Sequence, residues 1–373
     1  MNAKERLLFG TVQAIPQRNS LVSQAVAFLD AQIAAGQWRE WLPPERTLCE
    51  SMQVSRSTLR RALAQMRRDG RIRSEHGAGN RILLNTPARR GRLRSHDVAL
   101  LVPEPLERLR PTQTLWIDEL RAMLSEHSVR LHVFHGAQYF RADPSAALKK
   151  LLHQHPHGCW ILALASAGCQ QWFARHGIPC VIAGSCHAAI DLPFRDLDHR
   201  AMCRHAAGVL LAAGHRRLAF LAQETRLAGD IESEAGFLDG VNQSTSAGAS
   251  AQVCHHDATS AGIAHALRRL LAQRQAPTAL LVANAYHYLA VVSRLAQLGR
   301  LAPRDFSIIS RDEDPFLTFL APEPARYVAS PRALAKSLLR PVMELLEQGA
   351  VSQRAARLMP QFIRGGTVGP GRD

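Results

Sequence analysis

Apolar residues in the first 85 positions recur at helical spacing and predict three helices. The first runs from Leu21 to Ala35, with Gly36 as its C-cap. The second opens at Pro43-Pro44 and ends at Met52, because proline in the first turn of a helix costs little. Ser55 is a good N-cap for the third helix, whose apolar positions form one core-facing stripe: Leu59, Ala62, Leu63 and Met66.

Two short pieces in which apolar and polar side chains alternate follow the third helix. The first is Arg71 to Ser74 and the second ends at Leu84, with a glycine-containing turn between them, so a β-hairpin is expected. Three helices followed by a hairpin form a winged helix-turn-helix. We expect this domain in residues 1–85, with its core at 20–84, and a basic linker at 86–96.

From residue 97 onward, patterns of buried strands alternate with patterns of amphipathic helices. This alternation is typical of βαβ units and parallel sheets. The segment is long enough for two doubly wound lobes, so residues 97–373 are predicted to form a two-lobed α/β domain. Strands are expected at 98–102, 131–134, 160–163, 181–183, 218–222, 280–283 and 306–309, and helices at about 113–126, 199–213, 259–273, 285–298 and 331–348.

Positive charge is concentrated near the start of the chain. The net charge is +15, and residues 1–95 contribute +10 of it, from 17 Lys and Arg against 7 Asp and Glu. A short basic segment joined to a nearly neutral remainder favours a module that binds a polyanion, with nucleic acid as the leading candidate. A basic surface that serves only solubility is the alternative.

Composition and motifs exclude several other classes of protein. Hydrophobic residues make up 46% of the chain and charged residues 21%, which is typical of a globular protein. The seven cysteines include no C-x-x-C pair, so we expect reduced thiols and no zinc site. The histidines at 153–157 and 255–256 are expected on surface loops. We expect no catalytic residue, no cofactor, no metal and no membrane-spanning segment.

One stretch carries a resemblance to a known family. LPPERTLCESMQVSRSTLRRALAQMRRDGRIRSEHGAGNRI resembles the DNA-binding domain of GntR-type bacterial transcription regulators. The match includes the LPxER entry, the VSRxTxRxAL recognition helix and the RxxGxG wing. The resemblance implies that DNA is contacted by Arg46, Ser55, Arg56, Ser57, Thr58, Arg60, His76 and Gly77.

The expected DNA contacts fall into two physical roles. Arg56, at the start of the third helix, can fork onto guanine O6 and N7 in a major groove. Ser55 and Thr58 suit phosphate oxygens, which position a protein without specifying sequence. Taken singly, each of these residues has another interpretation, since exposed arginines on a helix usually form only a solvated face.

A second resemblance covers most of residues 97–368. The segments DHRAMCRHAAGVLLAAGHRRLAFLAQ, ESEAGFLDGV, PTALLVANAYHYLAVVSRLAQLGRLAPRDFSIISRDED and RLMPQFIRGGT are similar to the effector domain of LacI/GalR-type repressors, which has a periplasmic-binding-protein fold. That family has RxxGFxxAL where ESEAGFLDGV stands and SVxGFDD where SIISRDED stands. The resemblance implies a ligand between the two lobes, at the carboxyl ends of strands, with Asp198, Asn284 and Asp312 facing it.

Two departures from the family pattern affect this expected ligand site. Ser233 stands where the pattern has an arginine, and Ala285 stands where it has an aspartate after the asparagine. Either the ligand is unusual or the cleft is vestigial and serves only dimerisation. Asp198 is alternatively a helix N-cap, and Asn284 and Asp312 are alternatively loop-capping residues.

The sequence thus predicts a cytoplasmic, sequence-specific DNA-binding transcription regulator. We expect a repressor and homodimer whose affinity for double-stranded operator DNA is modulated by a sugar or related polyol. The first alternative is a DNA-binding regulator whose large domain only dimerises it. The second is a cytoplasmic sugar-binding protein or sugar-modifying enzyme on the same fold.

Overall fold

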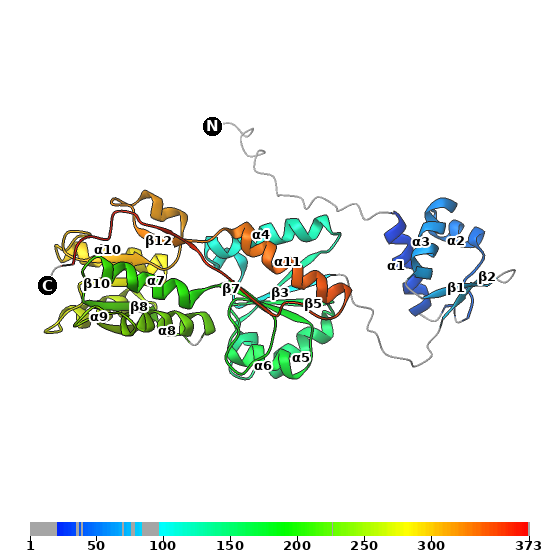
Figure 1. Ribbon diagram of the computed structural model, residues 1–373. Helices are drawn as coiled ribbons and strands as arrows, with labels where there is room; N and C mark the ends of the chain where they lie inside the picture. Colours follow the sequence, from blue (N-terminus) through cyan, green and yellow to red (C-terminus); the bar gives the residue numbers. More distant parts are fainter. Residues whose placement is uncertain are drawn as a thin grey trace, which may run out of the picture. The chain divides into compact units, whose positions relative to one another are not determined.

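The chain forms two compact units that divide at residue 92, and each is described by itself. The structure is a computed structural model, shown in Figure 1. The residues that it describes are 21–34, 37–38, 40–68, 71–75, 79–83, 97–225 and 227–371.

The smaller unit contains three helices and a two-stranded antiparallel sheet, which confirms the predicted winged helix-turn-helix. Gly36 lies outside the described residues. The apolar stripe of the third helix is fully buried at Leu59, Leu63 and Met66, where it packs against Leu29. The elements are α1 (Leu21–Ala34), α2 (Glu45–Met52), α3 (Arg56–Arg68), β1 (Ile72–Glu75) and β2 (Gly79–Ile82).

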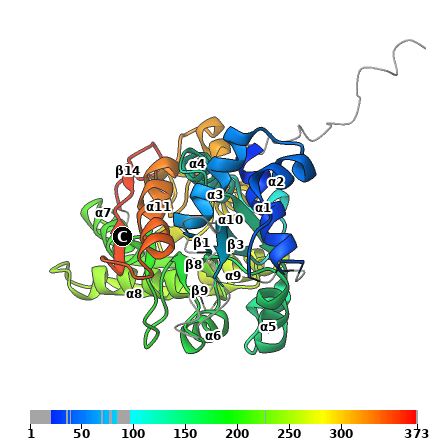
Figure 2. The ribbon, with the colours of Figure 1, turned by 90° about the vertical axis from the view of Figure 1, so that its right-hand side faces the viewer.

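The larger unit has two lobes, and the first is built on a parallel sheet in the order β13-β7-β6-β5-β3-β4. Helices α4 and α11 cover one face of this sheet and α5 and α6 cover the other (Figure 1 and Figure 2). Val98–Val102 is fully buried because both faces are covered. The elements are β3 (Val98–Val102), α4 (Pro111–Glu126), β4 (Leu131–His135), α5 (Ser145–Gln154), β5 (Cys159–Ala163), α6 (Ala167–Arg175), β6 (Cys180–Ala183), β7 (Phe194–Leu197), α11 (Pro331–Glu347) and β13 (Ala355–Leu358).

The second lobe repeats this arrangement with the sheet order β14-β12-β11-β10-β8-β9. Its strands are parallel, apart from β14, which runs antiparallel to β12. Helices α7 and α8 pack on one face of the sheet, and α9 and α10 pack on the other. The elements are α7 (His199–Ala212), β8 (Arg217–Gln223), α8 (Ala228–Asn242), β9 (Ser250–His256), α9 (Ser260–Leu271), β10 (Ala279–Val282), α10 (Ala285–Gln297), β11 (Ser307–Ser310), β12 (Ala325–Val328) and β14 (Gln361–Ile363).

The chain crosses between the lobes three times in its described part: after β7, after β12 and after β13. In both sheets the first strand of the lobe, β3 or β8, lies next to the edge strand that follows it in sequence, which sets a reversal of strand order beside β3 and beside β8. In open α/β sheets, ligands bind outside the carboxyl ends of the strands at such a reversal. The two-lobed, doubly wound fold predicted from the sequence is confirmed, and this geometry fixes where a ligand site is to be sought.

Some helices and strands of the larger unit were missing from the prediction, and two of them lack a clear apolar period. Strand β7 contains the buried charges Arg195 and Asp196, so it has no hydrophobic run. Helix α8 buries small residues such as Gly236, where an added Cβ would lie 2.2 Å from the carbonyl oxygen of Arg200 in α7. The other unpredicted elements are α5, α6, β9, β12 and β13.

Candidate functional site

Three hydroxyl groups converge at the start of α3. The Ser55 Oγ accepts a hydrogen bond from the Thr58 backbone N–H at 3.2 Å, which confirms Ser55 as the N-cap. It also lies 2.9 Å from the hydroxyl oxygens of Ser57 and Thr58. Hydroxyl donors at the positive end of a helix form a surface suited to a phosphate group.

The arginines predicted to contact DNA differ in the partners of their side chains. Arg60 donates from Nε to Glu45 Oε2 at 3.0 Å, and Arg46 lies 3.6 Å from a carboxylate oxygen of Glu50 one turn further along α2. Arg56 is exposed, and no described residue forms a hydrogen bond or ion pair with its side chain. Arg56 is therefore the arginine of this surface that is free to reach a partner. His76 and Gly77 lie outside the described residues.

The second site is a cleft between the two lobes of the larger unit, with a volume of about 680 Å³. Its walls include the residues that directly follow β3, β5, β8 and β10, such as Glu104, Ala165, Glu224 and Asn284. These are the carboxyl ends of strands on either side of the strand-order reversals. The cleft thus lies where the fold predicts a ligand site.

The structure brings two of the three predicted ligand residues into this cleft. Asn284 and Asp312 line it, and the Asn284 Oδ1 also accepts the Tyr286 backbone N–H at 2.8 Å. Asp198 does not line the cleft. Its Oδ1 accepts the Ala201 backbone N–H at 2.9 Å as the N-cap of α7, and the residue borders a separate surface hollow beside Arg200.

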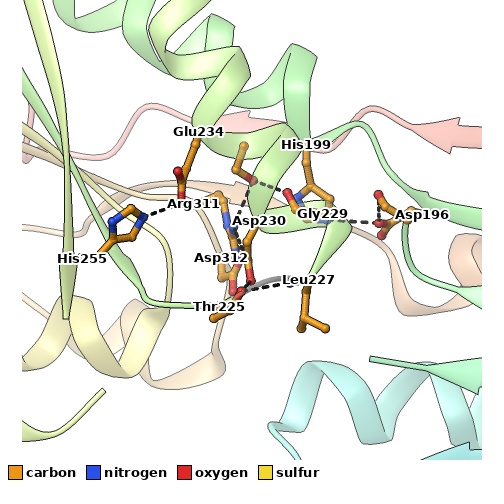
Figure 3. Close-up of polar contacts among 12 residues, drawn as sticks. Asp196, His199, Thr225, Leu227, Gly229, Asp230, Glu234, His255, Arg311 and Asp312 are labelled. Carbon is orange, nitrogen blue, oxygen red and sulfur yellow. Dashed lines mark hydrogen bonds and ion pairs between the residues drawn. The ribbon is translucent and has the colours of Figure 1, made fainter. Parts of the chain in front are cut away.

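A buried arginine organises the acidic side of the cleft (Figure 3). Arg311 is 7% exposed and donates to Asp230 Oδ1 at 2.8 Å, to Ser233 Oγ at 3.0 Å and to Asp312 Oδ1 at 3.1 Å. The other oxygen of Asp312 accepts a hydrogen bond from Arg110, which belongs to the first lobe. An ion pair therefore joins the two lobes across the cleft.

These arginines keep the carboxyl groups charged. Burial by itself would raise the pKa of Asp312, but the guanidinium groups of Arg311 and Arg110 outweigh it and hold that pKa well below its ordinary range. The pKa of Asp230 is lowered in the same way, with burial opposed by Arg311 and by the Thr225 hydroxyl. The cleft consequently presents ionised carboxylates at neutral pH.

Arg311 also accounts for one of the two departures from the family pattern. Where that pattern has an arginine at position 233 and a phenylalanine at position 311, this chain has Ser233 and Arg311. The Arg311 guanidinium bonds directly to the Ser233 hydroxyl, so the arginine is supplied from the end of β11 instead of from α8. The arginine that stands in place of the pattern's phenylalanine was the sequence signal for Arg311, and sequence reasoning missed it.

Asp196 is a further cleft residue that the sequence did not single out. It is 9% exposed and accepts from the Ser185 hydroxyl at 2.6 Å and from the Leu197 backbone N–H at 2.8 Å, and the His199 Nε2 lies 3.4 Å away. Burial opposes its ionisation, but His199 and these hydrogen bonds lower its pKa. The end of β7 separates the two aspartates: Asp196 lies within the strand and lines the cleft, whereas Asp198 lies beyond it and caps α7.

A neutral histidine pair borders the second lobe's side of the cleft. His287 lines the cleft, is 8% exposed, and lies edge to face against His256 with ring centroids 4.6 Å apart. Burial and the neighbouring His256 lower the pKa of His287 to about 4. Its Nδ1 is buried, and no described residue forms a hydrogen bond with it.

The described residues contain no cluster of three or more His, Cys, Asp or Glu side chains that could hold a metal ion. No described helix is long and apolar enough to cross a membrane.

Two known protein families match segments of this chain. The family of bacterial regulatory proteins named gntR matches residues 21–82, which include α3 and the wing strands. The periplasmic binding protein-like domain family matches residues 207–368, which include most of the second lobe. The chain is a DNA-binding transcription regulator that joins a domain of the gntR family to a periplasmic binding protein-like domain.

Solved structures share the fold of the regulator's larger unit. A regulatory protein of the LacI family from Chloroflexus aggregans is 16% identical over 74% of this chain and 99% of its own, with a TM-score of 0.65. A LacI family regulator from Enterococcus faecium with bound ribose is 14% identical over 74% and 100%, with a TM-score of 0.60. The complex of the transcriptional regulator CelR with cellobiose is 18% identical over 94% and 100%, with a TM-score of 0.65. A comparison with curated protein sequences found no match.

Proposed function

We propose that this regulator is a cytoplasmic repressor that acts as a homodimer and loses or gains operator affinity when a sugar or related polyol enters the cleft. The cleft at the strand ends, with Asn284, Asp312 and Asp196 on its walls, is the observation that carries this proposal. Carboxylate and amide groups suit a polyhydroxylated ligand because they accept or share hydroxyl hydrogen bonds. The solved complexes with ribose and cellobiose on the same fold support this choice of ligand.

The DNA side of the proposal assigns a role to each exposed group at the start of α3. Arg56 reads a guanine edge in the major groove, while Ser55, Ser57 and Thr58 hold phosphate oxygens. Arg46 and Arg60 contribute to the same surface, and His76 and Gly77 of the predicted wing approach the backbone. We assign DNA binding to residues 1–85, the linker to residues 86–96, and effector binding and dimerisation to residues 97–373.

Regulation would follow from a change in lobe closure. Asp230 and Asp312 belong to one lobe and Arg110 and Asp196 to the other, so a ligand that contacts both sides favours one closure state over another. A ligand can shift an equilibrium only by its difference in affinity for the two states. In the homodimer, that shift changes the spacing of the two winged helices on the operator.

The test uses the full-length protein and an operator selected from genomic fragments. We expect a carbohydrate that raises the melting temperature to change operator affinity at the same concentration, measured by fluorescence anisotropy. Asn284→Ala should lose both effects of the carbohydrate and keep operator binding. Arg56→Ala should keep the shift in melting temperature. A carbohydrate that stabilises the protein without any change in operator affinity would disprove the proposed regulation.

A second candidate function has one observation in its favour. Asp312 and Asp230 already have cationic partners within the chain, since Arg311 and Arg110 bind them without a ligand. A cleft that serves only as a dimerisation scaffold is expected to have its charged side chains paired within the chain in this way. If a panel of neutral, phosphorylated and amino sugars leaves the melting temperature unchanged, this candidate replaces the first.

A further inference from the structure

We propose that the natural ligand of the cleft carries a cationic group, an ammonium or a guanidinium, beside its hydroxyls, and that this group takes the place of Arg110 at Asp312. The inference rests on the proposed function for the existence of a cleft ligand and adds its chemical class.

The first step concerns the two ends of the Asp312 carboxylate. Its inner oxygen is 3.1 Å from the Nε of Arg311. Arg311 is itself occupied by Asp230 and Ser233 and is 7% exposed, so it is committed to the protein. Arg311 therefore keeps the Asp312 carboxylate ionised through its inner oxygen, Oδ1. The outer oxygen, Oδ2, is the one that faces a partner in the cleft.

The second step concerns that partner. Arg110 precedes α4 in the first lobe, and its guanidinium bonds to the outer oxygen of Asp312 in the second lobe. Among the described residues, the side chain of Arg110 has no other hydrogen-bond or ion-pair partner. Its side chain is 29% exposed, against 15% for Asp312. The Arg110 side chain can therefore be hydrated when it separates from Asp312, whereas the more buried Asp312 carboxylate needs another hydrogen-bond partner.

The nature of that replacement follows from hydrogen-bond energetics. A bond between an ionised donor and an ionised acceptor is roughly twice as strong as one between neutral groups. A ligand hydroxyl that displaced Arg110 would exchange a charge-assisted bond for a weaker one. A ligand ammonium or guanidinium would restore the bond at Asp312 and free Arg110, so the cleft should select for it.

The other charged residues of the cleft also favour a cationic ligand. Six carboxylate side chains and three arginines line it, and Glu313 is paired with Arg326 at 3.3 Å, which leaves five carboxylates. Asp196 is 9% exposed, and no Lys or Arg of the described residues forms an ion pair with it. A cleft with an excess of ionised carboxylates concentrates cations and repels anions.

The other cleft groups offer hydrogen bonds but no stacking surface. His287 provides a buried Nδ1 without a partner. The lining aromatic residues Trp116 and Tyr327 are each 2% exposed, and their polar atoms are occupied by Gln113 and His205. Recognition in the cleft thus depends on charge and hydrogen bonding, which is compatible with a small aminated polyol.

The experiment compares matched ligands on the full-length protein. Glucose with glucosamine and galactose with galactosamine differ in one hydroxyl that is replaced by an ammonium group, and glucuronate supplies the opposite charge. We expect calorimetric titration at pH 6.5 to give at least tenfold tighter binding for the amino sugar of a pair. Equal or tighter binding of the neutral sugar or of glucuronate would overturn the inference.

Two variants test the site itself. Arg110→Gln removes the internal competitor and should tighten binding of the amino sugar about tenfold. Asp312→Asn should abolish the preference within each pair. If Asp312→Asn weakens both members of a pair equally, or Arg110→Gln weakens the amino sugar, Arg110 and Asp312 do not exchange partners as proposed. Arg332→Gln is the matched control, since that side chain is 77% exposed on α11.

Operator binding, measured with the same ligands, separates this inference from the proposed function. If a neutral sugar binds and changes operator affinity while its amino counterpart does not, the proposed function stands and the cationic ligand is disproved. If no member of the panel binds the wild type or Arg110→Gln, both fail together.

Discussion

At the scale of single residues, Arg56 and Thr58 separate base reading from phosphate contact. Arg56 is exposed and has no partner among the described residues, while the Thr58 hydroxyl belongs to the cluster around Ser55. We expect Arg56→Ala to cost about 1 to 3 kcal/mol on the cognate operator and much less on scrambled duplex. Anisotropy titrations at fixed salt measure both.

Thr58→Ala is the control for that prediction. It should weaken operator and scrambled duplex by similar factors, because phosphates carry no direct sequence information. If Arg56→Ala also weakens both duplexes equally, Arg56 holds a phosphate and does not read a base.

His287 gives a prediction about pH. Burial lowers its pKa to about 4 in the folded protein from an ordinary 6.5, so between these values the unfolded chain binds the extra proton. Its contribution to the free energy of unfolding should therefore fall as the pH falls from 6.5 towards 4, by about 2 kcal/mol at pH 5. Urea unfolding of the wild type and of His287→Gln at pH 7 and pH 5 measures this.

The variant isolates one histidine from the others. His287→Gln cannot take up the proton, so it should lose less stability than the wild type between the two pH values. Identical losses in the two proteins would mean that His287 is not held neutral in the fold.

At the scale of secondary-structure elements, Arg195 of β7 couples three segments of the first lobe. It is 2% exposed and donates to the backbone carbonyls of Phe194, Ser337, Gln353 and Arg354. The Ser337 carbonyl lies in α11 and would normally accept from residue 341, but Pro341 has no N–H. Arg195 thus satisfies a carbonyl that the proline leaves without a helical donor.

Removal of Arg195 should be costly because buried carbonyls lose their donors. We expect Arg195→Met to lower the free energy of unfolding by about 2 kcal/mol or more, since each unsatisfied buried group costs roughly 1 to 3 kcal/mol. Arg332→Gln on the surface should stay within about 0.5 kcal/mol. In a Pro341→Ala background the cost of Arg195→Met should shrink, and an unchanged cost would exclude this role for the arginine.

Elements with a regular apolar run or stripe could be predicted, and two elements that lack one, β7 and α8, could not. The apolar stripe on α3 and the apolar runs of β3 and β10 could be recognised in the sequence, because burial on one or both faces leaves a regular pattern of apolar residues. Strand β7 escaped prediction because its buried residues Arg195 and Asp196 are charged, and Arg195 is satisfied by distant backbone carbonyls. The pattern cannot show partners that lie more than 140 positions away.

At the scale of the whole molecule, the charge of the first 95 residues sets how DNA binding depends on salt. Each neutralised phosphate contributes about −0.9 to the slope of log K against log salt concentration. With several arginines in each protomer of the proposed homodimer, we expect a slope of about −5 or steeper for operator binding between 50 and 200 mM salt, measured by anisotropy. A slope near zero would count against binding through phosphates.

The sequence by itself determined the class of the protein. The helix pattern, the charge asymmetry and the two family resemblances lie in contiguous segments, so local reading was sufficient to expect a winged helix joined to a two-lobed α/β domain. The resemblance to the LacI/GalR-type effector domain also named Asp198, Asn284 and Asp312 as expected ligand-facing residues, and two of them, Asn284 and Asp312, line the cleft.

Only the tertiary structure decided which charges share the cleft and what binds them. Arg110 and Asp312 are separated by 202 positions, and Arg311 and Ser233 by 78. The end of β7 at Leu197 leaves Asp196 in the cleft and Asp198 at the N-cap of α7. The energy of a charge depends on the partners and the burial that surround it in space, and the order of residues along the chain does not encode either for a single sequence.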